Sequence, residues 1–296
     1  MSDALAVDKR MVRRSFEQAA ATYDAAAVLQ NEVCRRMMAR LDYIRLEPAT
    51  ILDAGSGTGN AVAGLLARYP CARVIALDLA LAMARRARAR RAWWRGLFER
   101  SGPRLAAVCG DIEQLPLAPA CAGMVWSNLA IQWSNEPQRT FAEMNRVLAP
   151  GGLLLFSTFG PDTLKELRAA FESVDRHTHV HRFTDMHDVG DMLVACGFAD
   201  PVMDMEVVTL TYADVRELMR DLKAIGAHNV TRGRPSALAG KSLLAKVARN
   251  YEPARREGRL PATFEVIYGH AWKPVGHRLS AGVKPVKVYL PQRESR

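Results

Sequence analysis

The stretch DAGSGTG, residues 53–59, decides the fold of this chain. It follows a short apolar run at 50–54 and precedes residues 60–69, which have the pattern of a helix and end before Pro70. Glycines at such a turn permit positive φ angles and let a ligand lie against bare backbone. The order of strand, glycine turn and helix therefore predicts a binding loop at the edge of an α/β sheet.

Two other classes of glycine loop do not fit this stretch. A dinucleotide-binding fingerprint needs a glycine at position 60, where the chain has Asn60. A phosphate-binding P-loop ends in Gly-Lys-Ser or Gly-Lys-Thr, and the tripeptide Gly-Lys-Ser at 240–242 follows no strand and has Pro235 where the first glycine belongs. The loop at 53–59 therefore binds something other than a pyrophosphate.

Apolar runs and helical stretches alternate on both sides of the loop. Further strands are expected at 73–78, 105–109, 123–127, 153–158, 201–212 and 263–272. Helices are expected at 1–45, 80–95, 137–148, 162–174, 185–196 and 214–225, and residues 226–260 are expected to be helical in part. Strands separated by helices of this length predict a Rossmann-like α/β fold, with a parallel sheet covered on both faces.

Polar side chains stand at the carboxyl ends of the first four expected strands. Asp53 precedes the glycines, Asp78 ends the second strand, Asp111 follows the third and Asn128 follows the fourth. In an open α/β sheet the carboxyl ends of neighbouring strands meet in one crevice. This series of residues resembles the motifs of the class I S-adenosylmethionine-dependent methyltransferases.

That resemblance implies a seven-stranded, mostly parallel sheet whose last strand runs antiparallel, and S-adenosylmethionine as the cofactor. It places the three glycines along the methionine part of the cofactor and Asp78 on the ribose hydroxyls. It also places Asp111 at the adenine amino group and Ile112 on the adenine ring. The expected cofactor-binding residues are Asp53, Gly55, Gly57, Gly59, Asp78, Leu79, Asp111, Ile112 and Asn128.

The segment after the fourth strand indicates the class of methyl acceptor. Residues 127–130 read SNLA and lack the Asn/Asp-Pro-Pro-aromatic motif of amide and adenine N-methyltransferases. A Pro-Cys nucleophile for cytosine methylation is also missing at a strand end, because Pro70-Cys71 precedes a strand. Both nucleic-acid chemistries are therefore disfavoured, and no nucleic-acid partner is expected.

Longer stretches resemble one family within this class. They are FEQAAATYDAAAVLQ at 16–30, SNLAIQW at 127–133, FGPDTLKELR at 159–168, residues 183–191, LKAIGA at 222–227 and LPATFEVIYGHAWK at 260–273. Together they are similar to the BioC family, the malonyl-acyl-carrier-protein O-methyltransferases of biotin synthesis. Two alternatives stay open: a methyltransferase-fold assembly factor of respiratory complex I that is tied to arginine modification, and a small-molecule or quinone methyltransferase.

The family resemblance implies methyl transfer to the free carboxylate of a malonyl group on acyl-carrier protein or coenzyme A. Because carboxyl groups ionise near pH 4, no general base is needed. Tyr23, Gln132 and Trp133 are expected to position the reactants. The substrate carboxylate needs a cation, for which the candidates are Arg182, Lys223 and Arg234.

The chain has 296 residues and a net charge of +10, from 41 Lys and Arg against 31 Asp and Glu. The excess lies in 84–104, 226–260 and 273–296, so we expect an acidic carrier protein to dock on the basic segment 226–260, near Arg255 and Arg256. Five cysteines without a CxxC pair predict free, buried thiols in a reducing cytoplasm. No membrane partner is expected, and the triplet His177, His179 and His181 is not expected to bind a metal.

One domain is predicted over residues 1–275. Within it we expect an N-terminal helical cap at 1–48, a cofactor-binding core at 49–160 and a lid insertion at 226–260. Residues 276–296 are basic and rich in proline, and a flexible tail is expected there.

Overall fold

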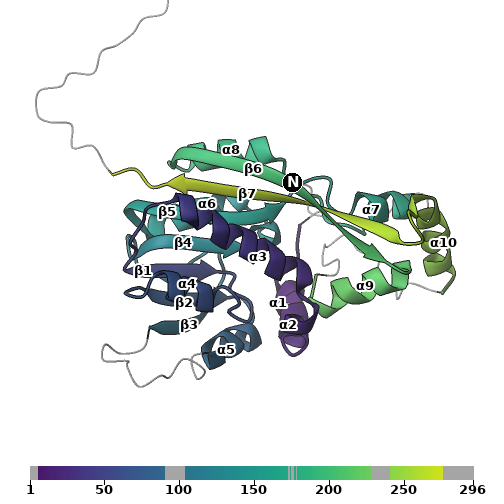
Figure 1. Ribbon diagram of the computed structural model, residues 1–296, viewed down its shortest axis with the longest axis horizontal. Helices are drawn as coiled ribbons and strands as arrows, with labels where there is room; N and C mark the ends of the chain where they lie inside the picture. The colour runs from purple at the N-terminus through teal and green to yellow at the C-terminus, as the bar shows by residue number, and fades with distance from the viewer. Residues whose placement is uncertain are drawn as a thin grey trace, which may run out of the picture.

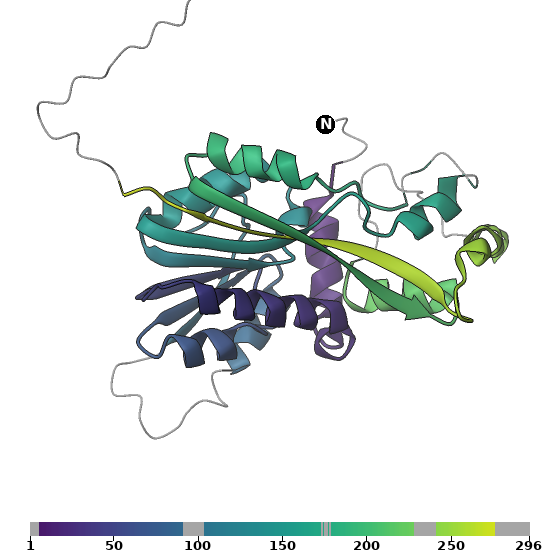
Figure 2. The ribbon, with the colours of Figure 1, turned by 45° about the horizontal axis from the view of Figure 1, so that its top comes forward.

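A computed structural model describes residues 6–90, 104–172, 174, 177, 179–227 and 241–275. The described residues form a seven-stranded sheet in the order β3-β2-β1-β4-β5-β7-β6 (Figures 1 and 2). The strands are β1 Thr50–Ala54, β2 Arg73–Asp78, β3 Leu105–Cys109, β4 Ala122–Asn128, β5 Leu148–Phe159, β6 Ala199–Tyr212 and β7 Leu260–Trp272. β7 pairs antiparallel with β5 and with β6, whereas the other pairs are parallel. The predicted fold class is therefore confirmed.

Helices cover both faces of the sheet, as Figure 2 shows. They are α1 Lys9–Ala19, α2 Tyr23–Ala26, α3 Val28–Arg40, α4 Val62–Arg68, α5 Leu81–Ala89, α6 Pro137–Val147, α7 Lys165–Glu172, α8 Met186–Ala195, α9 Val215–Ala224 and α10 Lys241–Tyr251, with 3-10 turns η2 Leu41–Tyr43, η4 Ile131–Trp133 and η5 Glu252–Ala254. α3 and α4 pack into one core with one face of the sheet, and α6 and α8 pack into another core on the opposite face. This double covering explains why β1 is buried along almost its whole length.

Two expectations about element boundaries are wrong. The expected single helix at 1–45 is interrupted at 20–22 and again at Ala27, which gives α1, α2 and α3. The interruption lets α1 pack against α5 while α3 packs on the sheet. The second error concerns 148–152, which continues as β5 instead of ending α6 with a turn, because Leu148 pairs with Ala122 and the Gly151 N–H donates to the Lys273 carbonyl at 2.8 Å.

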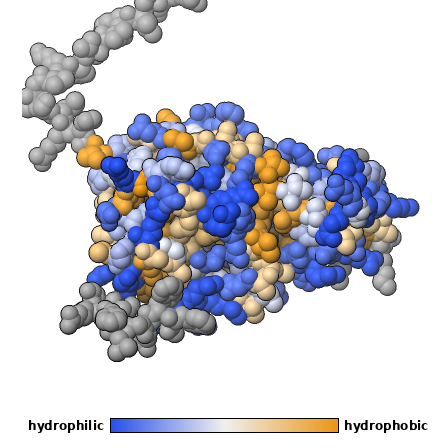
Figure 3. Space-filling model, viewed as in Figure 1, coloured by the Kyte–Doolittle hydropathy of each residue, from blue (hydrophilic) through white to orange (hydrophobic). Residues whose placement is uncertain are grey.

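The surface is largely hydrophilic on the face shown in Figure 3, and a hydrophobic band crosses it near the middle of the molecule. The edge strand β6 exposes Val202, Met205 and Val207.

Across the described part of the chain, no helix combines the length and the apolar character that a membrane span requires. All five cysteines are free thiols, as predicted, but only Cys34 is buried, whereas Cys71 and Cys109 are exposed.

Candidate active site

The glycine turn after β1 has the backbone that its sequence predicts. Gly55, Gly57 and Gly59 have φ angles of +81°, +53° and +81°. The N–H groups of Gly55 and Ser56 both donate to the Leu77 carbonyl, at 2.8 and 2.9 Å, which ties the turn to the end of β2. A Cβ on Gly55 would lie 2.2 Å from the Cβ of Ala130. Glycine is thus required at position 55 by both conformation and space.

Asp78, at the end of β2, faces this turn. Its Oδ2 accepts from the Gly57 N–H at 2.8 Å, and its Oδ1 accepts from the Ala80 N–H at 2.9 Å. Burial raises the pKa of Asp78 to about 6, although these two N–H groups act in the opposite direction. Each carboxylate oxygen keeps a further lone pair, so the group can still accept hydrogen bonds from a ligand.

Asp53, at the other side of the turn, is only 2% exposed. Burial, together with the nearby Asp78 carboxylate, raises the pKa of Asp53 to about 8. Within the described part of the chain, Asp53 Oδ2 and Ser56 Oγ have no hydrogen-bond partner. Buried polar atoms are normally paired, so these two atoms indicate the place of a ligand that carries a donor or a positive charge.

A third carboxylate follows β3 at the far end of the same cleft. Asp111 Oδ1 accepts from Lys9 Nζ at 3.0 Å and from the Glu113 N–H at 3.0 Å. Lys9 also lies 3.2 Å from Glu113 Oε1, so the start of α1 is held against this end of the cleft. Ile112 beside it is buried and offers an apolar surface.

We use the name cofactor cleft for the hollow that these groups surround. Its lining residues include every one of the nine predicted cofactor-binding residues except Gly59: Asp53, Gly55, Gly57, Asp78, Leu79, Asp111, Ile112 and Asn128. Asn128 has a structural role as well, since its Nδ2 donates to the Gln30 carbonyl and its Oδ1 accepts from Ser157, both at 3.0 Å. Gly59 lies outside the cleft, where its Cα faces Ala87 of α5.

Tyr23, the first residue of α2, lines the cleft over the glycine turn. Its neighbour Asp24 accepts a hydrogen bond from Thr58 Oγ1 and pairs with Arg90 Nη2 at 3.1 Å. Arg90 Nε also donates to the Thr58 carbonyl at 2.7 Å, so α2 is fastened to the turn. Burial and the carboxylates of Asp78 and Asp24 raise the pKa of Tyr23, so its hydroxyl stays protonated and can donate.

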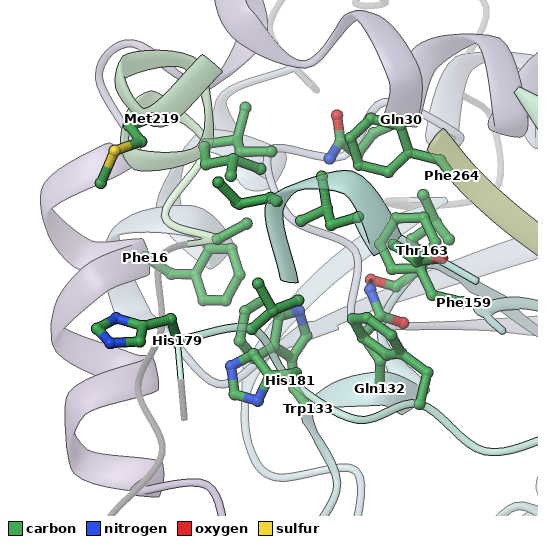
Figure 4. A pocket seen from close by; sticks show the side chains of 18 of the residues that line it. Phe16, Gln30, Gln132, Trp133, Phe159, Thr163, His179, His181, Met219 and Phe264 are labelled. Carbon is green, nitrogen blue, oxygen red and sulfur yellow. Dashed lines mark hydrogen bonds between the residues drawn. The ribbon is translucent and has the colours of Figure 1, made fainter. Parts of the chain in front are cut away.

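A second hollow, which we call the acceptor pocket, opens beside the cofactor cleft (Figure 4). Its wall is aromatic, and ring centroids lie 5.4 Å apart for Phe16 and Trp133, 5.5 Å for Trp133 and His181, and 5.5 Å for Phe159 and Phe183. The pocket shares Phe16, Tyr23, Leu129 and Trp133 with the cofactor cleft. The two hollows therefore meet at these side chains.

Only some of the residues that were predicted to bind or position the acceptor line this pocket. Gln132 and Trp133 line the acceptor pocket, and Gln132 Nε2 donates to the Leu129 carbonyl at 2.7 Å, which leaves its buried Oε1 without a described partner. Arg182 and Lys223 are exposed and do not line the pocket. Arg234 lies outside the described residues. No lysine or arginine is among the described side chains that line this pocket.

Most of the pocket wall was not predicted from the sequence. Phe16, Gln30 and Phe264 come from α1, α3 and β7, whereas Phe159 and Thr163 lie four residues apart at and just after the end of β5. One signal was available: alternation in an extended segment puts His179 and His181 on one side, and both line the pocket (Figure 4). In the part of the chain that the structure describes, no group of three His, Cys, Asp or Glu side chains could hold a metal ion.

Known proteins share this fold. A family model described as a methyltransferase domain matches residues 52–156, which hold the glycine turn and the first carboxylates. Among solved structures, the YcgJ protein from Bacillus subtilis superposes with a TM-score of 0.57 at 15% identity, over 83% of this chain and 99% of that one. A putative methyltransferase from Bacillus halodurans C-125 has a TM-score of 0.54 at 20% identity, over 80% of this chain and 98% of that one. At such identities the likeness concerns the fold. With the cleft and the family model, it defines a class I methyltransferase.

Closer relatives identify the family within that class. A malonyl-[acyl-carrier protein] O-methyltransferase of Gallionella capsiferriformans (strain ES-2) is 58% identical over 268 residues, which are 90% of this chain and 92% of that protein. The corresponding protein of Methylovorus sp. (strain MP688) is 55% identical over 295 residues, 99% of both chains. The chain belongs to the malonyl-[acyl-carrier protein] O-methyltransferase family.

Proposed function

We propose that this chain transfers a methyl group from S-adenosylmethionine to the free carboxylate of a malonyl group carried by acyl-carrier protein. The observation that carries the proposal is the junction of an acidic cleft with an aromatic pocket at Phe16, Tyr23, Leu129 and Trp133. The family membership favours this reaction over arginine modification or quinone methylation. Free thiols are consistent with work in the cytoplasm, where we place the reaction.

The residues of the cofactor cleft fit S-adenosylmethionine. The unpartnered Asp53 Oδ2 suits a cationic group, and the glycine turn leaves room at Gly57, where the nearest side chain to an added Cβ would be Tyr23 at 3.7 Å. Asp78 would hold the ribose, and Asp111 with Ile112 would hold the adenine. When bound, the cofactor would supply a methyl group on a sulfonium, with the neutral thioether as the leaving group.

The acceptor pocket suits a reaction in which charge disappears. An anionic carboxylate and a cationic sulfonium give a neutral ester and a neutral thioether. A water-poor aromatic wall favours such a transfer, whereas an arginine bound to the carboxylate would stabilise the ground state. The exposure of Arg182 and Lys223 is consistent with this chemistry.

Polar side chains would then orient the carboxylate. Tyr23 stays protonated next to the junction, and His181 lies edge-on against Trp133 inside the pocket. We assign Tyr23, Trp133 and His181 to positioning of the acceptor, with Gln132 alongside. The substrate carboxylate is ionised at neutral pH, so the task of these residues is alignment and exclusion of water.

The domain organisation of the proposed enzyme follows from the same contacts. Residues 1–48 act as a cap, because Phe16 and Tyr23 lie over the junction, and 49–160 form the cofactor-binding core of one domain that runs to residue 275. In the lid segment 226–260, Ala227 lines the pocket whereas α10 packs against α7. Met219 and Leu222 of α9 line the pocket just before this segment, so we count the end of α9 as part of the lid. Residues 276–296 lie outside the described residues.

A methyl-transfer assay tests the proposal. Purified protein is incubated with S-adenosylmethionine and malonyl-acyl-carrier protein, and the carrier is analysed by mass spectrometry. The malonyl group should gain one methyl, and acetyl-acyl-carrier protein, which lacks the free carboxylate, should gain none. Cofactor binding without any methylated malonyl product, or faster turnover of a phenolic acceptor, would contradict the proposal.

A further inference from the structure

Helix α9 carries a row of cations beside the acceptor pocket. Arg216, Met219, Arg220 and Lys223 are spaced i, i+3, i+4 and i+7, so they share one face of the helix. Met219 lines the pocket and is labelled at its rim in Figure 4. The three cationic side chains are exposed. We call Arg216, Arg220 and Lys223 the α9 cations.

The acidic residues of the same helix are engaged elsewhere. Asp214 Oδ1 caps the helix by accepting from the Glu217 N–H at 2.9 Å, and Glu217 Oε2 accepts from the Ala213 N–H at 2.6 Å. Asp221 is hydrogen-bonded to Tyr212, whose pKa is raised first by burial and then by the nearby Asp221 carboxylate. The α9 cations have no ion pair with any described residue. The α9 cations therefore present their positive charge to the solvent next to the pocket.

Other arginines on the surface are used within the chain. Arg255 pairs with Glu252 and donates to the Ala213 and Gly258 carbonyls at 3.2 and 2.7 Å. Arg256 donates to the Pro253 and Arg255 carbonyls at 3.2 and 2.9 Å. Arg255 and Arg256, where the carrier was predicted to dock, thus use their guanidinium groups to stabilise the η5 turn. The α9 cations are better placed to receive an acidic partner.

We propose that the acidic recognition helix of the carrier protein docks on the α9 cations, so that its prosthetic arm enters the acceptor pocket past Met219 and Leu222. The inference rests on the proposed function and adds the surface that recognises the carrier. Both side chains line the pocket from α9, so the helix that would bind the carrier is also a wall of the pocket. This explains how one short element can join protein recognition to delivery of the malonyl group.

The end of α9 is also fixed to the cap over the junction. Thr22 Oγ1 donates to the Ala224 carbonyl at 3.4 Å, and a Cβ on Gly226 would lie 3.1 Å from Phe16. Phe16 lines both the cleft and the pocket. Docking on α9 therefore acts on an element that is in contact with the site of methyl transfer.

Charge reversal with two substrates tests the docking surface. The variant R216E/R220E is compared with K246E/R249E, which makes the same change in charge at exposed positions of α10 that do not line the pocket. Each is assayed with malonyl-acyl-carrier protein and with malonyl-pantetheine, which has the arm without the protein. For R216E/R220E the KM for the carrier should rise at least about tenfold, with the value for malonyl-pantetheine changed less than about twofold. K246E/R249E should change neither.

The outcomes separate this proposal from the proposed function. An unchanged carrier KM in R216E/R220E, or an equal rise for both substrates, would overturn docking on α9 while the reaction itself stands. If the unaltered protein methylated neither malonyl substrate, the proposed function itself would be wrong. The carrier KM of the unaltered protein should also rise with added salt more steeply than that of R216E/R220E, because screening acts on charges that the variant has lost.

Discussion

The cofactor cleft and the acceptor pocket lie side by side, yet they are built in opposite ways. The cleft carries carboxylates, and its main polar groups follow consecutive strand ends: the glycine turn after β1, Asp78 at the end of β2 and Asp111 after β3. The pocket is aromatic and takes side chains from α1, α2, α3, β5, α7, α9 and β7. Short local motifs thus specify the cleft, whereas only tertiary packing assembles the pocket.

The difference lies in what each region must do. In the cleft a ligand would contact the backbone directly. Individual positions there therefore require one particular residue, because of its φ angle, its close approach to a neighbouring atom or its charge. The pocket must exclude water and leave space, a task that many apolar side chains can perform. Substitutions in the cleft should therefore cause larger and more specific losses than substitutions in the pocket.

The largest effect is expected at Asp53. Asp53→Asn removes the carboxyl group that a cationic part of the cofactor would ionise, and kcat/KM should fall at least about a hundredfold, with most of the loss in cofactor affinity. Asp42→Asn makes the same chemical change at an exposed ion pair with Arg68 and should leave both values within about twofold. Isothermal titration with S-adenosylmethionine and steady-state kinetics measure these effects. Equal cofactor affinity in the two variants would contradict the assignment of Asp53.

The next largest effect, a loss of stability, is expected from a substitution in the glycine turn. Gly55→Ala combines a φ of +81° with a Cβ 2.2 Å from that of Ala130, and the free energy of unfolding should fall by about 3 kcal/mol. Gly258→Ala is the matched control, because its φ is +75° and nothing lies within 4 Å of the added Cβ. It should cost about 1 kcal/mol and leave activity intact. Similar denaturation curves for the two variants would show that space at position 55 does not matter.

A pH effect on stability is expected from the cleft alone. The pKa of Asp53 is raised from its ordinary value of 3.8 to about 8, so the folded chain holds a proton that the unfolded chain has lost across this interval. Without cofactor, the free energy of unfolding should therefore decrease as the pH rises from about 4 to 8. Asp53→Asn should lack this part of the slope, so it should be more stable than the unaltered protein at pH 8. Parallel stability curves for the two proteins would contradict the raised pKa.

The smallest effect is expected in the acceptor pocket. His181→Ala should raise the KM for malonyl-pantetheine about tenfold and leave the dissociation constant of S-adenosylmethionine within about twofold. Arg182→Ala, one residue further and exposed, should leave both constants unchanged. If Arg182→Ala alone raised the KM, the carboxylate would be bound by a cation after all, and the charge-loss argument for the pocket would fail.

The residues of the cleft could be predicted from the sequence better than those of the pocket. Strand ends and helices between them could be predicted because alternation of element types depends on local hydrophobic patterns. The break of the N-terminal helix at 20–22 could not, because it depends on α1 and α3 packing against different partners. For Arg182, charge suggested a ligand for the carboxylate, but the fold turns His181 into the pocket and leaves Arg182 exposed.

By itself, the amino-acid sequence determined the class of fold, the glycine turn and the carboxylates at the ends of β1, β2 and β3, because these depend on backbone conformation and strand order. Tertiary structure alone decided which aromatic side chains meet at Trp133, which cations border the pocket on α9 and which arginines are held by their own turn. Those features depend on contacts between segments far apart in the chain, and residue type does not specify such contacts.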